Sequence, residues 1–166
     1  MASGNTLLEL LPQGASFPAA NYMTFDTRNV HLVLDADATT DETVYWEAFL
    51  PAHYAGGGLT CNIAWMATSA TTGTARFEAA IERHDDEVTD LDADSFATAN
   101  SAGGAAPATS GAVEYTAITF TNGAQMDSLA VGEHFRFLLR RDADGTTGTD
   151  DMTGDAEILG VYVTET

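Results

Sequence analysis

The chain has 166 residues, with six arginines, no lysine and 25 acidic residues, so its formal net charge at pH 7 is -19. Such a charge repels nucleic acids and anionic membrane surfaces, so neither is expected as a partner. Cys61 is the only cysteine, which excludes an intrachain disulfide, and no apolar run approaches the length of a membrane-spanning helix. The first residues lack the basic start and apolar run of a signal peptide, so we expect folding in a cytoplasm.

Apolar and polar side chains alternate along several short segments bounded by Gly, Pro, Asp and Asn. This period of two is typical of strands that turn one face toward a core. The strands predicted in this way are residues 6–11, 29–36, 43–50, 59–67, 74–83, 112–120, 134–141 and 157–164. The fold class that follows is all-β, an antiparallel two-sheet sandwich or jelly roll of about eight strands.

The alternation also predicts which side chains face inward. In 29–36 they are Val30, Leu32 and Leu34; in 59–67 they are Leu59, Cys61, Ile63, Trp65 and Ala67; in 112–120 they are Val113, Tyr115 and Ala117. Cys61 is therefore expected to be a buried, inert thiol.

Between the strands lie segments of a different character. Residues 16–26 read as an extended arm, residues 124–131 as a helical turn, and residues 85–111 as a long polar stretch with an edge strand near residues 96–101. We divide the chain into an N-terminal arm or first strand, residues 1–28, and a sandwich domain, residues 29–166.

No motif in the sequence specifies catalysis, and we expect no enzyme, no catalytic residues and no cofactor. Nucleophile elbows, phosphate loops, dinucleotide fingerprints and zinc-protease helices are all absent. The four histidines, His31, His53, His84 and His134, are far apart in sequence and read as surface or sheet-edge residues. A glycosidase would need two carboxylates facing each other across a groove, and Glu47, Glu78 and Glu82 occupy outward strand positions, but nothing in the sequence selects a pair.

Two acidic segments are weak calcium candidates. Asp90, Asp92 and Asp94 imitate the first ligands of a calcium loop, but the glycine and the final glutamate of that motif are missing. Asp142 and Asp144 begin a second acidic loop. Because aspartate is common in solvated turns, no metal is assigned.

Three segments carry a resemblance to a known group: "HLVLDADATTDETVYWEAFLPAHYAGGGLTCNIAWMATSATTG", "ATSGAVEYTAITFTNGAQMDSLAVGEHFRFLLRRDAD" and "MTGDAEILGVYVTET". They resemble small β-sandwich structural proteins of tailed bacteriophages, over roughly residues 29–166. The resemblance implies a jelly-roll-like virion protein, made in the host cytoplasm and located on the particle. The first hypothesis is a capsid decoration or cement protein. The alternative is a tail-fibre or head-fibre module that binds a host receptor or glycan.

The decoration reading implies a homotrimer seated on the major capsid protein or other virion proteins. Both faces of 43–50 and 59–67 are apolar, which favours an interface, and the candidate trimer contacts are Tyr45, Phe49 and Met66. The apolar run Leu7, Leu8, Leu10 and Leu11 is a candidate capsid contact, or alternatively an ordinary first strand. A glycan-binding reading would instead use Tyr45, Phe49 or Tyr54 for stacking on a sugar.

Overall fold

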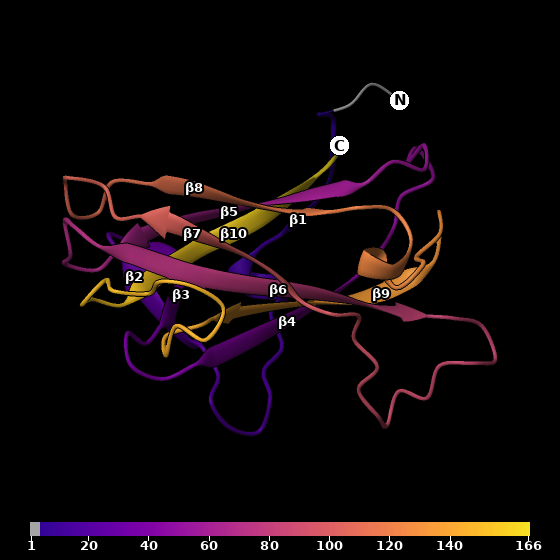
Figure 1. Cartoon of the computed structure of the whole chain (residues 1–166), viewed down its shortest axis with the longest axis horizontal. Helices are drawn as coiled ribbons and strands as arrows, with labels where there is room; N and C mark the ends of the chain where they lie inside the picture. The colour runs from indigo at the N-terminus through magenta and orange to yellow at the C-terminus, as the bar shows by residue number, and fades with distance from the viewer. Residues whose placement is uncertain (1–3) are drawn as a thin grey trace.

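Two antiparallel sheets face each other across a common interior in the computed structural model, which describes residues 4–166 (Figure 1). The six-stranded sheet has the order β2 (Thr24–Arg28), β3 (His31–Ala36), β10 (Ala156–Glu165), β5 (Leu59–Ala67) and β8 (Glu114–Phe120), with β1 (Thr6–Leu10) also paired to β10. The four-stranded sheet has the order β4 (Glu42–Phe49), β9 (His134–Arg141), β6 (Thr74–His84) and β7 (Asn100–Ala105). The predicted all-β sandwich is confirmed.

The helical content is confined to two short 3-10 turns, η1 (Pro12–Gly14) and η2 (Ala124–Met126). The predicted helical turn at 124–131 therefore covers only its first three residues. Within residues 4–166, no helix is long and apolar enough to cross a membrane.

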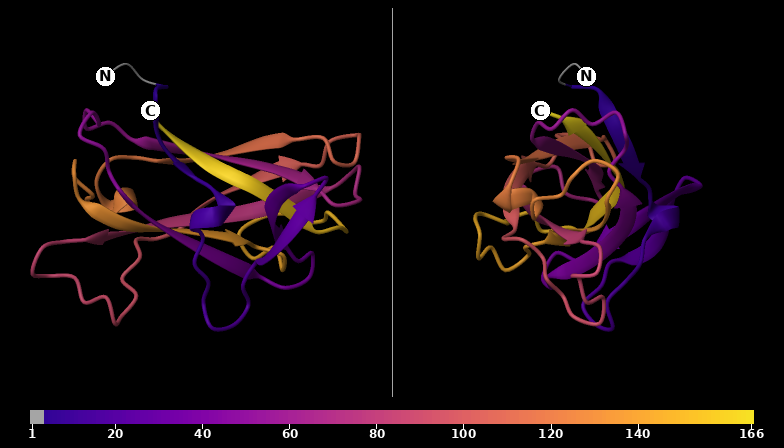
Figure 2. Two further views of the ribbon diagram at one scale, coloured as in Figure 1. Left: turned by 180° about the vertical axis from the view of Figure 1, so that it is seen from behind. Right: turned by 90° about the vertical axis from the view of Figure 1, so that its right-hand side faces the viewer.

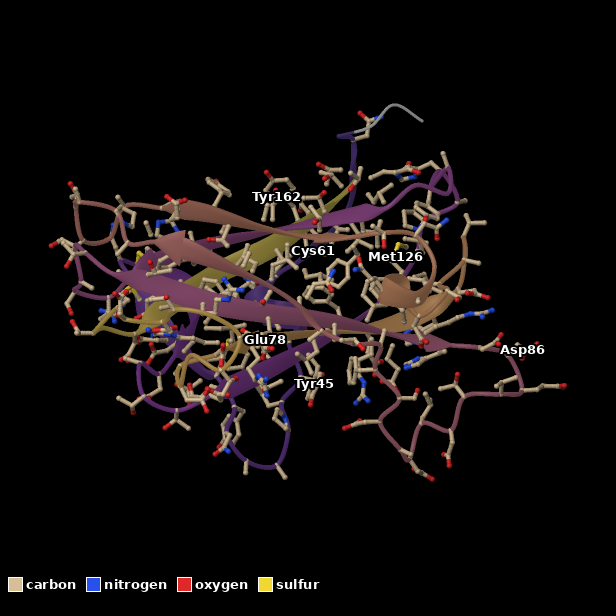
Figure 3. The ribbon with its side chains drawn as sticks, in the orientation of Figure 1. Tyr45, Cys61, Glu78, Asp86, Met126 and Tyr162 are labelled. Atoms are coloured by element: carbon tan, nitrogen blue, oxygen red, sulfur yellow. The ribbon has the colours of Figure 1, made fainter. Side chains whose placement is uncertain are left out.

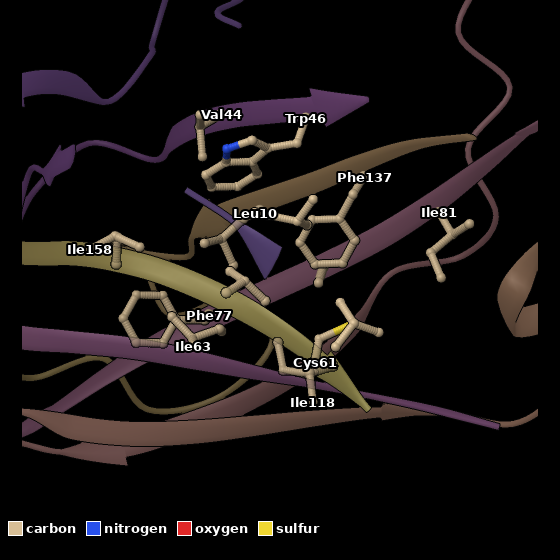
Figure 4. Packing of buried hydrophobic residues seen from close by; sticks show 14 of the residues in the cluster. Leu10, Val44, Trp46, Cys61, Ile63, Phe77, Ile81, Ile118, Phe137 and Ile158 are labelled. Carbon is tan, nitrogen blue, oxygen red and sulfur yellow. The ribbon is translucent and has the colours of Figure 1, made fainter. Parts of the chain in front are cut away.

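The two sheets enclose an interior (Figure 2), which aromatic and aliphatic side chains from both sheets fill (Figure 4). Trp46 packs near Phe137, and Trp65 meets Phe77 edge to face with ring centroids 5.4 Å apart. Each indole N–H also has a buried acceptor: Trp46 donates to the carbonyl of Leu11 at 2.8 Å, and Trp65 donates to the hydroxyl of Thr116 at 2.9 Å. A buried indole without an acceptor would cost about 1–3 kcal/mol, so these bonds let large rings enter the core.

Strand β5 has the predicted register, with Leu59, Cys61, Ile63, Trp65 and Ala67 buried and the side chains between them half-exposed. Burial raises the pKa of the Cys61 thiol, in keeping with an inert residue. Strand β8 has the opposite register from the one predicted, because Thr116, Ile118 and Phe120 are buried while Tyr115 and Ala117 face out. Ile118 and Phe120 are on average larger and more apolar than the side chains predicted to face inward, Val113, Tyr115 and Ala117. They are therefore the ones buried in the core.

The segment predicted as an arm contributes to the sheets. Within 16–26, residues Thr24 onward belong to β2, which pairs with β3, and single bridges join Ser16 to Tyr45 and Tyr22 to Thr43. The short β2 was missed because it carries a single large apolar residue, Phe25, and so shows no alternation. The predicted edge strand is real but lies four residues later, as β7.

A tight hairpin joins β2 to β3 through only two residues, Asn29 and Val30. Both have positive φ, 47° and 70°, which is the conformation of the two-residue hairpin turn that follows the sheet's twist. Val30 was predicted to face inward but is 94% exposed in this turn. A β-branched residue is strained at positive φ, so hairpin closure here works against the local preference of Val30.

We expect Val30→Gly to raise the free energy of unfolding by about 1 kcal/mol, because glycine adopts positive φ without steric penalty. Denaturant titration would measure the change. Val30→Ala removes the same exposed side-chain atoms but keeps a Cβ, and it should give a smaller gain. Equal stability of Val30→Gly and the wild type would contradict the assignment of strain to this turn.

Candidate functional site

A groove runs over the outer face of the six-stranded sheet, formed by two adjoining hollows of about 210 and 490 Å³ that share Leu159. Tyr162 reaches this face because of a β-bulge in β10 at Leu159. Ile158 pairs with Trp65 and Gly160 pairs with Ala64, which leaves Leu159 as the extra residue between them. Bulges commonly re-aim a side chain in this way. The bulge thus joins the two hollows into one apolar floor.

The smaller hollow carries two tyrosines from neighbouring parts of the sheet, Tyr115 on β8 and Tyr162 on β10. Their rings meet edge to face with centroids 6.2 Å apart. Tyr115 is 59% exposed, whereas Tyr162 is half-buried, so Tyr115 presents its ring and Tyr162 supports it. Figure 3 shows Tyr162 on the upper side of the sandwich, opposite Tyr45.

The larger hollow combines apolar side chains with hydrogen-bonding groups. Met66 and Val113 continue the apolar floor, and Arg28, Asn29 and His31 come from the β2–β3 hairpin. The Asn29–Val30 turn therefore positions the polar end of the groove. An elongated apolar surface with a few polar groups along its edge is the usual composition of a small-molecule or polymer site.

A pair of buried carboxylates lies beside the groove, where Asp35 of β3 is in register with Glu157 of β10. One oxygen of Glu157 accepts from Arg28 Nε at 2.8 Å and from the Thr68 hydroxyl at 2.9 Å. Its second oxygen and Asp35 Oδ1 are buried and have no hydrogen-bond partner within the described residues. Burial, and after it the charge of Glu157, raises the pKa of Asp35 to about 6.

The outer face of the four-stranded sheet is closed by contrast. Glu78 and Glu82 lie on outward positions as predicted, but each is buried and ion-paired, Glu78 with Arg140 and Glu82 with Arg136. The loop between β6 and β7 folds over Glu82, and Ser95 donates two hydrogen bonds to its carboxylate. These carboxylates are held by arginines, so they do not face each other across an open cleft.

The same loop covers Tyr45, one of the predicted contact residues. Phe96 stacks on Tyr45 with ring centroids 5.8 Å apart, and the guanidinium of Arg136 lies 5.0 Å from the centre of the Tyr45 ring. Tyr54, the third aromatic residue considered for sugar stacking, is buried and donates to the carbonyl of Gly57. Phe49 is 66% exposed and touches His134.

The predicted interface residues do not share a surface. Tyr45 and Phe49 belong to the outer side of the four-stranded sheet, whereas Met66 lies in the groove on the other side of the sandwich. Leu7 and Leu10 are members of the core, and Leu8 packs against it, which corrects their placement at an interface. They are buried because β1 pairs with β10 over the interior. Leu11 is 48% exposed and lines the groove.

The acidic loops separate into two cases. Asp90 accepts a hydrogen bond from the backbone N–H of Asp92, and Asp94 pairs with Arg136, so the carboxylates of Asp90 and Asp94 stabilise a local turn and the closure of the loop. Asp142 and Asp144 come together with Asp41, with one oxygen of each within 4.8 Å of the others. Calcium at these candidates stays a prediction.

The carboxylate of Asp142 already has partners in its own loop. Burial works to raise its pKa, but hydrogen bonds from Thr147 and Thr146 outweigh burial and hold the pKa at about 2. Through these hydrogen bonds, the Asp142 carboxylate stabilises the conformation of its own loop.

The residues that make the groove were largely missed in the sequence. Tyr115 was assigned to the core by the wrong register of β8, and Tyr162 follows a bulge that shifts the alternation of β10. Among the candidate site residues of the sequence, only Leu11 and Met66 line the groove, and both were predicted as contacts with virion proteins. A comparison of the two faces of 112–120 by side-chain volume would have placed Tyr115 outside.

Comparison with known proteins gives the fold. No protein-family model matches the chain, and no curated protein does either. Among solved structures, the K3 cleaved adhesin domain of Lys-gingipain from Porphyromonas gingivalis is 14% identical, with a TM-score of 0.53 over 97% of this chain and 100% of that chain. The CBM22-1 xylan-binding domain of Xyn10C from Paenibacillus barcinonensis is 9% identical, with a TM-score of 0.53 over 99% and 97%.

A xylan-binding module of the CBM15 type is 8% identical, with a TM-score of 0.51 over 98% of this chain and 97% of that chain. The chain also spans 29% of a longer Clostridium thermocellum xylanase chain that contains CBM22-1 and GH10 modules. At these identities the likeness shows a shared β-sandwich architecture, the jelly roll of carbohydrate-binding modules.

The Asp35–Glu157 pair generates a prediction about pH. Because the folded-state pKa of Asp35 is above its usual value, protonation stabilises the fold, and stability is lost as pH rises through about 6. Asp35→Asn should therefore raise the free energy of unfolding above pH 6, by an amount on the order of 1 kcal/mol given partial exposure. The gain should fade as pH falls from about 6 toward the ordinary pKa of 3.8, and it should vanish below that value, where the wild-type carboxyl is protonated in both states.

Denaturant titrations between pH 4 and pH 8 would measure this difference. Asp37→Asn is a control of opposite sign, since hydrogen bonds from Thr39 lower the pKa of Asp37, and its loss should destabilise the protein at neutral pH. A constant offset between Asp35→Asn and the wild type across the pH range would refute the role of the carboxylate pair.

Proposed function

We propose that this chain is a non-catalytic glycan-binding module, which binds an uncharged polysaccharide along the groove on the outer face of the six-stranded sheet. The observation that carries the proposal is the groove itself, an apolar floor with an exposed tyrosine at one end and hydrogen-bonding side chains at the other. Sugar rings have apolar faces that stack on aromatic rings, while their hydroxyls need partners at the edges.

The tyrosine end of the groove would hold one sugar. Tyr115 stands on β8 with its ring supported by Tyr162, so stacking requires little reorganisation of the protein. Glu9 lies at the edge of the same hollow and can accept hydrogen bonds from hydroxyl groups. A rigid aromatic ring beside a polar acceptor matches the two kinds of surface on one sugar unit.

The hairpin end would hold a further unit of the same chain. Asn29 and His31 offer donors and acceptors there, and Leu159 provides a continuous apolar path from the tyrosines. The fold shared with xylan-binding modules supports a glycan ligand, since three of the named solved structures carry that ligand in their descriptions.

The charge of the groove favours an uncharged ligand. Arg28 is the one guanidinium that lines it, and Glu157 and Asp26 already neutralise this group. The chain as a whole carries a net charge of -19. A polysaccharide with carboxylate or sulfate groups would therefore be repelled, and no free cation in the groove would compensate.

The location of the protein on a virion remains a proposal from sequence resemblance. The named solved structures add no support to a phage origin, to the major capsid protein as partner or to a homotrimer. Of the two virion hypotheses, a fibre module that binds a host glycan agrees better with this structure, because it is consistent with both the sequence resemblance and the groove.

Substitution of the groove tyrosine tests the proposal. Tyr115→Ala should weaken binding to a soluble neutral β-linked polysaccharide about tenfold or more, because the stacking surface is lost. Affinity electrophoresis and calorimetry against xylans and β-glucans would measure it. Tyr162→Ala should have a smaller effect, and Phe49→Ala, which removes an exposed aromatic ring on the opposite side, should have none. Binding that survives Tyr115→Ala but is lost in Phe49→Ala would move the site to the four-stranded sheet.

Ligand charge provides a second test. Neutral polysaccharides should bind with an affinity that barely changes with salt, whereas polyuronates should bind weakly at low ionic strength. A tight, salt-sensitive interaction with a polyuronate would show that the charge argument is wrong while leaving a glycan-binding function intact. Absence of binding to neutral, acidic and amino polysaccharides alike would count against the function itself.

A further inference from the structure

The fold brings together two histidines that are fifty positions apart in sequence. His84 ends β6 and His134 begins β9, and the two are cross-strand partners in the four-stranded sheet. Their Nδ1 atoms are 2.6 Å apart, with ring centroids separated by 4.8 Å. The sequence contains no sign of this pair, because pairing across two strands leaves no spacing signal.

The other nitrogen of each ring faces a carboxylate. Nε2 of His84 lies 3.9 Å from Glu82 Oε2, and Nε2 of His134 lies 3.8 Å from Glu47 Oε2. The His84 side chain is about nine-tenths buried, and its Nε2 has no hydrogen-bond partner in the part of the chain that the structure describes. Each ring thus has its Nδ1 atom toward the other ring and its Nε2 atom toward an acidic side chain.

This arrangement has the elements of a histidine metal site. A metal-binding histidine typically donates its second ring N–H to a carboxylate, which fixes the tautomer and orients the ring. Here Glu82 and Glu47 lie on the Nε2 sides, and the two Nδ1 atoms face each other in a hydrogen bond, in which one ring donates and the other accepts. Phe49 packs edge to face against His134, with ring centroids 4.7 Å apart, and restricts its rotation.

We propose that His84 and His134 form a binding site for a divalent transition metal ion of the zinc, copper or nickel type, held by both Nδ1 atoms. Imidazole nitrogen suits these ions, whereas calcium and magnesium prefer oxygen ligands. Metal–nitrogen bonds of 2.0–2.1 Å in tetrahedral geometry put the two nitrogens about 3.4 Å apart, so the rings must separate by less than about 1 Å. Water would complete the coordination.

The charged groups around the pair set the conditions for binding. Glu82 and Glu47 contribute negative charge, but Arg136 pairs with Glu82 and opposes a nearby cation. Burial, and then the neighbouring His134, lowers the pKa of His84, so this ring is neutral and able to bind a metal at pH 7. No proton needs to leave, because a change of tautomer frees the second Nδ1.

Calorimetric titration of the purified chain, prepared without a polyhistidine tag and treated with chelator, would test the site with zinc chloride and nickel chloride. We expect one ion per chain. His84→Ala and His134→Ala should each weaken binding by more than about tenfold, since even loss of an outer partner of a ligand costs 10–100-fold. Zinc should also raise the melting temperature of the wild type but not of the two variants.

His31→Ala is a matched control, because His31 is an exposed histidine of β3 in the other sheet, and this variant should bind zinc as the wild type does. His134 is partly exposed, so its substitution keeps the test valid if His84→Ala does not fold. No saturable binding of zinc or nickel to the wild type at submillimolar concentration would overturn the proposal. Wild-type affinity in His134→Ala would also overturn it and would place the ion elsewhere, for instance at the acidic loops.

Discussion

The pairing of β10 with β5 is the constraint on which the rest of the structure depends. The two strands run antiparallel from Ala156–Ala67 to Glu165–Leu59, in the middle of the six-stranded sheet. Their inner side chains, among them Ile63, Trp65 and Ile158, fill the core between the sheets. Their outer side chains Ala64, Met66, Leu159 and Tyr162 line both hollows of the groove. One non-local pairing therefore determines both the stability of the sandwich and the shape of the candidate site.

The two outer faces of the sandwich differ in whether their charged side chains are paired and covered. On the four-stranded sheet, arginines of β9 stand opposite glutamates of β6, and the loop between β6 and β7 covers the ion pair of Glu82 with Arg136. Opening a covered ion pair would leave a buried charge without its partner, which is unfavourable. This face is therefore rigid and closed. On the six-stranded sheet, Ala64, Met66 and Leu159 occupy outward positions in the groove, and this part of the surface stays open. The histidine pair lies at the end of the closed face, where the ladder of ion pairs stops.

The sequence predicts the fold class well, because period-two alternation depends only on which side of a strand is buried. Trp46 and Trp65 both face inward as their segments predict. The prediction fails where a tertiary feature overrides the local pattern. Val30 is exposed because the hairpin must turn there, and Tyr162 is displaced by the bulge at Leu159. The register of 112–120 reverses because two inward sets are possible and the larger residues, Ile118 and Phe120, take the interior.

The candidate sites were harder to predict than the fold, since each is assembled from strands that are distant in the chain. Tyr115 and Tyr162 meet only because β8 and β10 both flank β5. His84 and His134 meet only because β6 and β9 pair in one particular register. A shift of one residue in that pairing would put the two rings on opposite faces of the sheet. Residue type alone marked these side chains as capable of binding, and the topology decides which of them can act together.

The distribution of positive charge connects the structure to its possible ligands. The chain has six arginines and no lysine, and every arginine is engaged within the protein. Arg28, Arg83, Arg136, Arg140 and Arg141 pair with carboxylates, and Arg76 donates to Ser101 and to the carbonyl of Thr147. The cations thus organise loops and neighbouring strands, and the acidic surface stays uncompensated. The net charge of -19 opposes anionic partners, and the two ligands proposed above, an uncharged glycan in the groove and a metal cation at the histidine pair, are consistent with this charge.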